Sequence, residues 1–172
     1  MALSRPVRPE TSWAESIEVT PAVHDERDTG RVRSEESTTP DLVQLSRAWL
    51  AAGTSGDLDR TLSFWGPDPV WDMSPMGLEV FEGLTAIRGF YEDWMGAYED
   101  YRIEAEEIHD FGNGVTFCVV LQQGRLVGSG GTVQLRYGTC ADWVDGKAVR
   151  VWNHADIDEC RAAAERLAGE RA

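Results

Sequence analysis

Asp72 is the strongest candidate for a proton-transfer group in this sequence, because it stands between two large apolar residues, Trp71 and Met73. A carboxylate in an apolar cleft can remove a proton from a bound molecule, as a general base does. In a β-strand, however, successive side chains point to opposite faces. Either Asp72 enters a pocket as a base, or Trp71 and Met73 line the pocket and Asp72 points outward.

Asn153 and His154 form the second pair of catalytic candidates, near the end of the chain. Imidazole can gain and lose a proton near neutral pH, whereas an amide can orient a carbonyl group but cannot act as a base. Neighbours on a strand face opposite sides, so only one of the two enters a pocket unless the strand bulges. If Asn153 faces inward, we expect His154 to pack beneath the final helix.

A third set of residues is suited to line an apolar pocket. Strand alternation over residues 132–144 puts Tyr137, Thr139 and Trp143 on one face. Aromatic and apolar side chains upstream complete the predicted ligand-binding set: Trp49, Trp71, Met73, Tyr91, Tyr137, Thr139 and Trp143. The alternative is an ordinary hydrophobic core, although core and pocket wall partly coincide in a hollow fold.

Composition limits the partners of this chain. Its 172 residues carry 30 Asp and Glu against 16 Lys and Arg, a net charge of −14, which disfavours nucleic acid and anionic membrane surfaces. Neither a membrane-spanning run nor a secretion signal is expected. The widely spaced Cys118, Cys140 and Cys160 predict reduced core thiols in a cytoplasmic protein. No metal site is expected, and no cofactor motif is found.

The sequence divides into a tail and one domain. Residues 1–39 hold eight acidic residues and five Arg among few apolar positions, which predicts a disordered or weakly ordered acidic tail. In the domain, residues 40–172, we expect helices near 40–53, 57–65, 85–95 and 157–168, with Pro67 and Pro69 ending the second.

Strands are predicted near 70–73, 101–109, 115–122, 132–144 and 147–156. Asn113-Gly114 and Asp145-Gly146 are typical of two-residue hairpin turns. This order predicts an α+β fold, with a curved antiparallel sheet, helices from the N-terminal half packed on it, and a short C-terminal helix.

Four segments carry a resemblance to a known family: GDLDRTLSFW, VWDMSP, EGLTAIRGFY and WVDGKAVRVWNHADIDE. Their order and spacing resemble the nuclear-transport-factor-2-like superfamily, and in particular its bacterial SnoaL-like (polyketide cyclase) and ketosteroid isomerase-like members, over about residues 40–168. The resemblance implies a cone-shaped half-barrel with a deep apolar pocket, usually in a dimer. It implies no single activity, because this superfamily includes both enzymes and non-catalytic binders.

The sequence departs from the ketosteroid isomerase pattern at each catalytic position. The resemblance puts Trp49 in the place of the helix tyrosine and Thr139 near the place of the buried acid. The base position falls near Met73 or Ser74, and Asp72 is the only carboxylate close to it. An unmodified isomerase mechanism is therefore not expected.

On the last strand, Trp152-Asn153 aligns with a Trp–acid pair of the SnoaL-like cyclases, so an amide replaces a carboxylate. We expect a cofactor-independent cyclase, isomerase or dehydratase acting on a hydrophobic cyclic ketone, with Asp72 as base and Asn153 and Thr139 orienting the carbonyl. The alternatives are a non-catalytic binder of a hydrophobic ligand and a dimeric interaction module with a filled cone. A homodimer is expected because residues 115–121 are apolar on both faces.

Overall fold

The computed structural model describes residues 40–172, so the tail predicted for residues 1–39 lies outside the described residues. The described part contains four α-helices, one short 3-10 helix and six strands. The helices are α1 (Leu42–Ser55), α2 (Leu58–Leu62), η1 (Ser74–Met76), α3 (Gly83–Gly96) and α4 (Ile157–Glu170). The strands are β1 (Trp65–Asp72), β2 (Val80–Glu82), β3 (Tyr98–Gly112), β4 (Val115–Leu126), β5 (Thr132–Val144) and β6 (Lys147–His154).

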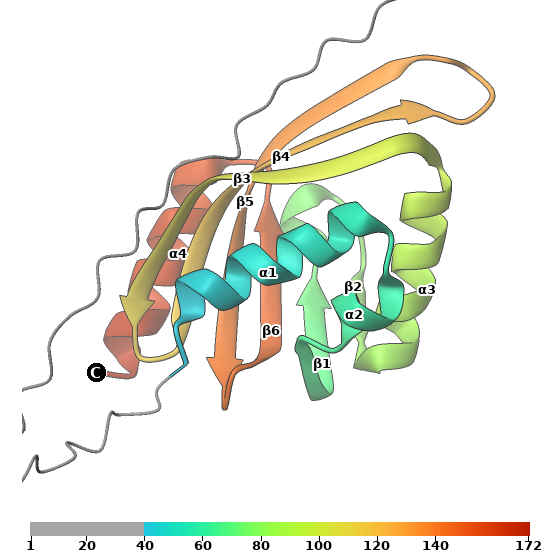
Figure 1. Ribbon diagram of the computed structural model, residues 1–172. Helices are drawn as coiled ribbons and strands as arrows, with labels where there is room; N and C mark the ends of the chain where they lie inside the picture. The colour runs from blue at the N-terminus through green and yellow to red at the C-terminus, as the bar shows by residue number, and fades with distance from the viewer. Residues whose placement is uncertain (1–39) are drawn as a thin grey trace, which may run out of the picture. The chain divides into compact units, whose positions relative to one another are not determined.

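The six strands form one curved, unclosed sheet in the order β2-β1-β6-β5-β4-β3 (Figure 1). The predicted α+β fold, with a short C-terminal helix, is therefore confirmed. Neighbouring strands are antiparallel, with one exception: β1 runs parallel to β6, and Trp71 lies beside Val151. The sheet is thus mixed, which the predicted purely antiparallel arrangement did not include.

Strand β1 begins earlier in the sequence than predicted. Trp65 was expected on the second helix, but α2 ends at Leu62 and Trp65 opens the strand. The register of β1 against β6 shifts between Trp65 and Val70, around Pro67 and Pro69. Proline lacks a backbone N–H and is tolerated where strand pairing is interrupted, so these prolines mark an irregular strand rather than a helix end.

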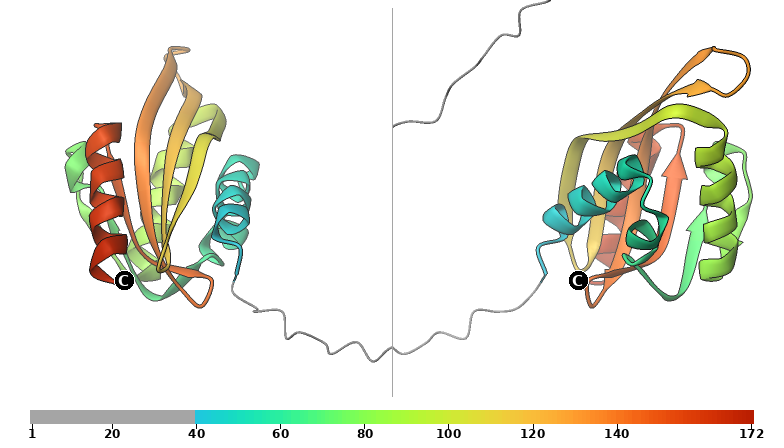
Figure 2. Two further views of the ribbon diagram at one scale, coloured as in Figure 1. Left: turned by 90° about the vertical axis from the view of Figure 1, so that its left-hand side faces the viewer. Right: turned by 45° about the vertical axis from the view of Figure 1, so that its right-hand side comes forward.

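Helices cover both faces of the sheet. Figure 2 shows α1 on one side and α4 on the other. Strand β4 is apolar on both faces for this reason: Phe117 and Val119 belong to the core cluster that includes residues of α4, whereas Cys118 and Val120 belong to the cluster next to α1. The apolar character from which we expected a dimer is therefore accounted for within the chain.

The two predicted hairpin turns are present. Asn113 and Gly114 have φ angles of 53° and 80°, and Asp145 and Gly146 have φ angles of 51° and 73°, as primed turns require. The turns meet in space, because the Trp143 backbone N–H donates to the Gly114 carbonyl at 2.7 Å. Together they fix the register of the strands β3 to β6.

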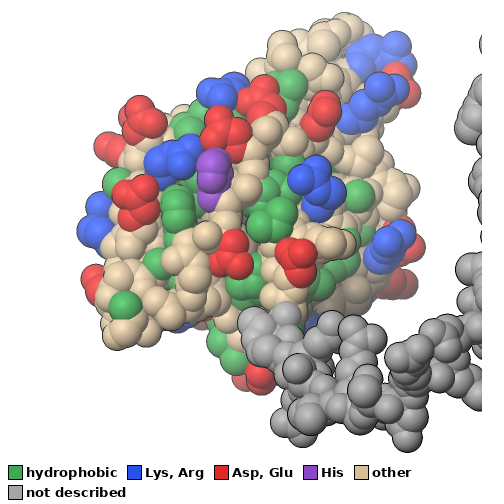
Figure 3. Space-filling view, turned by 60° about the vertical axis from the view of Figure 1, so that its left-hand side comes forward, with side chains coloured by type: hydrophobic (Ala, Val, Ile, Leu, Met, Phe, Trp, Pro, Cys, Tyr) green, Lys and Arg blue, Asp and Glu red, His purple; other side chains and the backbone are tan. Residues whose placement is uncertain are grey.

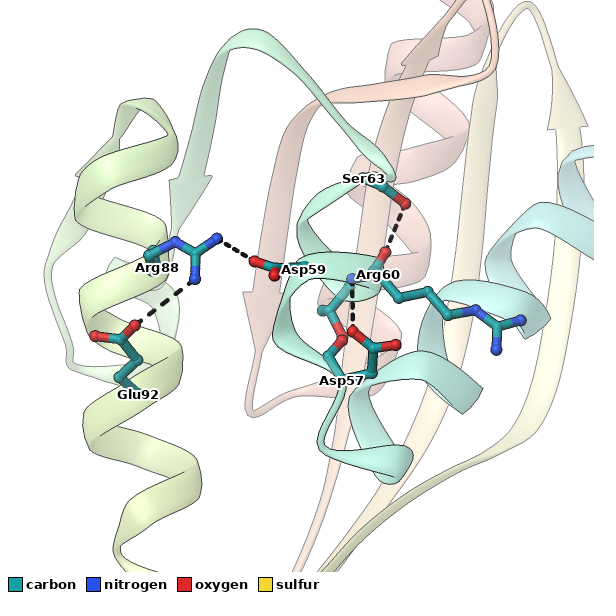
Figure 4. A network of polar contacts seen from close by, with 7 residues as sticks. Asp57, Asp59, Arg60, Ser63, Arg88 and Glu92 are labelled. Carbon is teal, nitrogen blue, oxygen red and sulfur yellow. Dashed lines mark hydrogen bonds and ion pairs between the residues drawn. The ribbon is translucent and has the colours of Figure 1, made fainter.

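A polar contact joins α2 to α3 (Figure 4). The guanidinium of Arg88 lies 2.6 Å from the carboxylate of Asp59 and 3.8 Å from that of Glu92. Asp57 begins α2 by accepting from the backbone N–H of Arg60 at 2.9 Å. These side chains are exposed, so the contact stabilises the fold little.

On the face shown in Figure 3, acidic and basic side chains are mixed rather than segregated. Figure 3 shows Asp and Glu side chains interspersed with Lys and Arg, with hydrophobic side chains between them on the same face. Among the helices of residues 40–172, none is long and apolar enough to cross a membrane.

Candidate functional site

Two adjoining cavities lie against the face of the sheet that carries α1 and α3. The first has a volume of about 40 Å³ and the second about 30 Å³. Five residues line both cavities, and we call them the junction: Trp71, Tyr91, Tyr101, Tyr137 and Asn153. The first cavity adds Trp49 and Thr139 among others, and the second adds Met73, Met76, Trp94, Gln122 and Leu135. Each cavity alone has room for only a few water molecules.

Asn153 is the buried amide of the junction, with 3% of its surface exposed. It pairs with Thr139 across β6 and β5, so both side chains face the same side of the sheet. The indole Nε1 of Trp71 donates to the Asn153 Oδ1 at 3.3 Å. An indole can only donate, so the amide oxygen must face Trp71. The Asn153 amide nitrogen is thereby left as the free donor at the junction.

Three tyrosines from three different elements meet at the junction: Tyr91 of α3, Tyr101 of β3 and Tyr137 of β5. Burial raises the pKa of each phenol above its ordinary value, and the neighbouring tyrosines raise those of Tyr91 and Tyr137 further. All three are therefore neutral at physiological pH. The hydroxyl groups of Tyr91 and Tyr137 can donate to an acceptor on a bound molecule, whereas that of Tyr101 donates to Gln122 Oε1, and none of the three can remove a proton.

Gln122 of β4 is the buried polar residue of the second cavity. Its Oε1 accepts from Trp94 Nε1 at 3.2 Å and from the Tyr101 hydroxyl at 3.4 Å. Its Nε2 is buried and has no hydrogen-bond partner among the described residues. Gln122 and Tyr101 were not among the residues predicted to line the pocket. A signal was available, because Gln122 continues the alternation that buries Cys118 and Val120.

Asp72 lies on the opposite face of the sheet from the cavities and lines neither of them. Its carboxylate accepts from the backbone N–H and the hydroxyl of Ser74, at 3.0 and 2.6 Å. It lies 4.0 Å from the guanidinium of Arg150, which in turn stacks 4.7 Å from the ring centre of Trp152. Strand alternation therefore sends Trp71 and Met73 inward and Asp72 outward, the second of the two predicted arrangements.

His154 also faces away from the cavities. It pairs with Gly138 on β5, whose added Cβ would lie 2.6 Å from the Cβ of Cys160 on α4. His154 thus lies on the face that α4 covers, as expected if Asn153 points inward. Its Nδ1 is buried and has no partner within residues 40–172. The structure therefore does not bring Asp72, Asn153 and His154 together.

Of the seven predicted ligand-binding residues, six line the cavities: Trp49, Trp71, Met73, Tyr91, Tyr137 and Thr139. Trp143 lines neither of them. Its ring packs edge-on against Trp49 at 5.9 Å, and its Nε1 donates to Thr116 Oγ1 at 2.8 Å. Trp143 shares the predicted face, but the core beneath α1 takes up its side chain.

The lining of the two cavities defines what they can do chemically. Among the described residues, the cavity walls hold no carboxylate, imidazole, amine or guanidinium, and their ionisable side chains are all tyrosines. Within residues 40–172, no group of three or more His, Cys, Asp or Glu could hold a metal ion. The walls instead offer aromatic faces and uncharged hydrogen-bond donors, which suit a neutral molecule with an acceptor oxygen.

Comparison with known proteins supports this architecture. The sequence model of the SnoaL-like domain matches residues 46–151, which hold most of the cavity wall. No curated protein matches this sequence. A hypothetical protein of ketosteroid isomerase-like fold from Catenulispora acidiphila, solved with trimethylamine, has 14% identity and a TM-score of 0.59. That match covers 74% of this chain and 94% of the other.

Two further solved structures are similar. An NTF2-like protein of unknown function from Burkholderia pseudomallei has 21% identity and a TM-score of 0.59, over 73% of this chain and 98% of that one. A protein from Xanthomonas campestris proposed to be a polyketide cyclase has 23% identity and a TM-score of 0.55, over 69% and 93%. At these identities the similarity shows the fold alone.

Proposed function

Because the chain belongs to the SnoaL-like domain family, we propose that it binds a small, neutral, cyclic ketone at the junction of its two cavities. The observation that carries this proposal is the orientation of Asn153, whose oxygen is held by Trp71 and whose nitrogen is left to donate. A ketone oxygen is the complementary acceptor. The aromatic rings of Trp49, Trp71 and Tyr91 supply flat apolar walls for the ring.

Binding without catalysis is the form of this function that the geometry favours. Converting a ketone into its enol requires a base within hydrogen-bond reach of the proton that leaves. The described cavity walls hold no carboxylate or imidazole, and Asp72 lies on the other face of the sheet. The junction donors can hold a carbonyl oxygen in place, which is sufficient for a receptor or carrier.

The test is calorimetric titration of the full-length protein with cyclohexanone. The key variant is Asn153→Asp, which keeps an acceptor for Trp71 but removes the donor. We expect its affinity to fall about tenfold or more, the effect of one lost buried hydrogen bond. Asn113→Asp is the matched control, because it makes the same change at the β3–β4 turn, outside both cavities. Equal affinity of wild type and Asn153→Asp would refute the proposal.

A cyclase, isomerase or dehydratase is the second candidate function, favoured by the similarity to the proposed polyketide cyclase from Xanthomonas campestris. In that case the family fold would perform chemistry, with Asp72 as the predicted base. Mass spectrometry of cyclic ketones incubated with the protein would detect a product. Turnover that Asp72→Asn abolishes would favour the enzyme and contradict binding alone.

The homodimer and the cytoplasmic location stay predictions. The dimer is supported by the resemblance to the superfamily, since the apolar faces of β4 are covered within the chain. The molecular mass in solution at micromolar concentration tests it. A mass of about 19.1 kDa would indicate a monomer and would contradict the prediction.

A further inference from the structure

Gln122 carries a hydrogen-bonding group that the fold leaves unused. The residue is 3% exposed and lines the second cavity. Its Nε2 is buried, yet no described residue accepts a hydrogen bond from it. Buried side-chain donors in folded proteins nearly always have a partner. An unpaired donor in a cavity wall therefore indicates that a bound molecule accepts its hydrogen bond.

The orientation of this amide is fixed by two other residues of the cavity wall. Trp94 of α3 and Tyr101 of β3 both donate to the Gln122 oxygen. If the amide were turned over, its NH₂ group would face the Trp94 N–H, and an indole cannot accept. Asn153 is held in the same way by Trp71. Two amides thus present their nitrogens to one pair of adjoining cavities, each oriented by a tryptophan.

The two amides approach from different strands of the same sheet face. Gln122 pairs with Leu135 and Asn153 pairs with Thr139, so their positions differ by four residues, about 13 Å, along β5. Tyr137 lies between Leu135 and Thr139 on this face of β5, so its side chain stands between the two amides. A molecule that reaches both amide nitrogens must therefore lie along the Tyr137 side chain and carry acceptor atoms on opposite sides.

Neither cavity alone can hold a six-membered ring. A dry cavity that binds benzene has a volume of about 150 Å³, whereas these cavities measure about 40 and 30 Å³. A ring must therefore occupy both cavities and displace some of their lining. Met73 and Met76 in the wall of the second cavity are flexible enough to move.

We propose that the ligand is a cyclic diketone, with one oxygen bound by Asn153 and the other by Gln122. This inference rests on the proposed function, because Asn153 and the junction hold the first oxygen. It adds a second recognition point at the far end of the site. The ligand class is then a flat or nearly flat ring with acceptor oxygens at opposite positions, of which the para-diketones and quinones are the simplest members.

The experiment compares two probes in calorimetric titrations: cyclohexanone and the para-diketone of cyclohexane. We expect the wild-type protein to bind the diketone at least tenfold more tightly than the monoketone. Gln122→Glu keeps an acceptor for Trp94 and Tyr101 but loses the free NH₂ donor. It is expected to weaken binding of the diketone more than binding of cyclohexanone, and so to remove the preference for the diketone. Gln123→Glu, the same change at the exposed neighbouring residue, is expected to keep the preference.

The outcomes separate this inference from the function on which it rests. If neither probe binds the wild type, the proposed function fails and this inference fails with it. If both bind equally well, or if Gln122→Glu keeps the preference, the diketone inference is overturned and the proposed function stands. In that case water accepts the hydrogen bond from the Gln122 Nε2. Gln122→Met, which is uncharged and of similar length, repeats the test if Gln122→Glu does not fold, with circular dichroism as the check.

Discussion

The indole of Trp71 donates to the amide oxygen of Asn153 at 3.3 Å and thereby links two strands that run parallel, β1 and β6. The contact is buried and joins two residues that are 82 positions apart in the sequence. It decides which end of the Asn153 amide faces the junction. A residue of the aromatic cavity wall thus also determines which atom of the Asn153 amide is available at the proposed binding site.

Trp71→Phe tests this control directly. The substitution removes the indole N–H, so the Asn153 oxygen loses its donor and the amide becomes free to turn. We expect a loss of about 1–3 kcal/mol in the free energy of unfolding, from the unpaired buried oxygen and the smaller ring. Affinity for cyclohexanone is expected to fall as well. Chemical denaturation and calorimetry measure the two effects, and an unchanged affinity would show that Trp71 does not orient the amide.

Asp72→Asn separates the two faces of β1. The Asp72 carboxylate accepts two hydrogen bonds from Ser74 on the face of the sheet away from the cavities. Removing its charge is expected to lower the free energy of unfolding by about 0.5–1.5 kcal/mol. Ligand affinity should stay within about twofold of the wild type. A large loss of affinity in a folded Asp72→Asn protein would show that the carboxylate reaches the ligand, contrary to the placement described here.

Alkaline pH is expected to destabilise the protein through its buried phenols. Burial raises the pKa values of Tyr91, Tyr101 and Tyr137, so the folded state keeps protons that the unfolded chain loses near pH 10. The buried phenols make their full contribution to the free energy of unfolding below pH 10. Above pH 10 this contribution falls by up to about 1.4 kcal/mol per pH unit for each group. Burial also raises the pKa of Cys118 and of Cys140 to about 12. These thiols therefore also destabilise the folded state as the pH rises above about 8.5.

Denaturant unfolding at a series of pH values, with tyrosinate absorbance as a second signal, measures this effect. Tyr137→Phe should make the loss of stability above pH 10 less steep. A folded protein whose tyrosines all ionise near pH 10 would contradict the burial of these hydroxyls.

Arg171 ties the end of α4 to the sheet. Its guanidinium binds both carboxylate oxygens of Asp142, with Nη2 at 2.6 Å from Oδ2, and the Asp142 side chain is only 8% exposed. Arg171→Ala leaves this carboxylate without its partner, so we expect a loss of about 1–3 kcal/mol in the free energy of unfolding. Arg166→Ala, on the exposed side of the same helix, should change it by less than about 0.5 kcal/mol. Equal effects would show that the ion pair contributes nothing.

Two glycines offer a matched test of packing. A Cβ added at Gly138 would lie 2.6 Å from the Cβ of Cys160, so Gly138→Ala should destabilise the protein by about 1–3 kcal/mol. Gly89 in α3 has no atom within 4 Å of an added Cβ, so Gly89→Ala should stabilise it by about 0.5–1 kcal/mol. Melting temperatures that move in the same direction would contradict the close contact of α4 with β5.

Local patterns in the sequence predict much of this structure. Alternation puts Asp72 on the opposite face from Trp71 and Met73, and it puts Tyr137 on the same face as Thr139. Which face of β1 carries the cavities came from the structure. The Asn-Gly and Asp-Gly turns fix two hairpins because their backbone geometry is local. Such features depend on neighbours within a few residues, and the sequence shows those neighbours directly.

The remaining features depend on residues that are distant in the sequence. Trp143 has the right alternation for a cavity wall, but Trp49 of α1 and Thr116 of β4 contact its side chain. Strand alternation indicates that Gln122 is buried, but it does not show that Trp94 and Tyr101 hold its oxygen. The direction in which the Gln122 amide donates therefore had to come from the structure.

The parallel pairing of β1 with β6 also bears on how the chain folds. Strands β3 to β6 are joined by short turns and can pair locally, whereas β1 meets β6 across about 80 residues of chain. Closing so long a loop costs conformational entropy before any stabilising contact forms, so we expect the pairing of β1 with β6 to form late in folding. Because the pairing of β1 with β6 brings Trp71 to Asn153, the proposed binding site forms only in the completed fold. A ligand that binds there should slow unfolding more than it speeds folding.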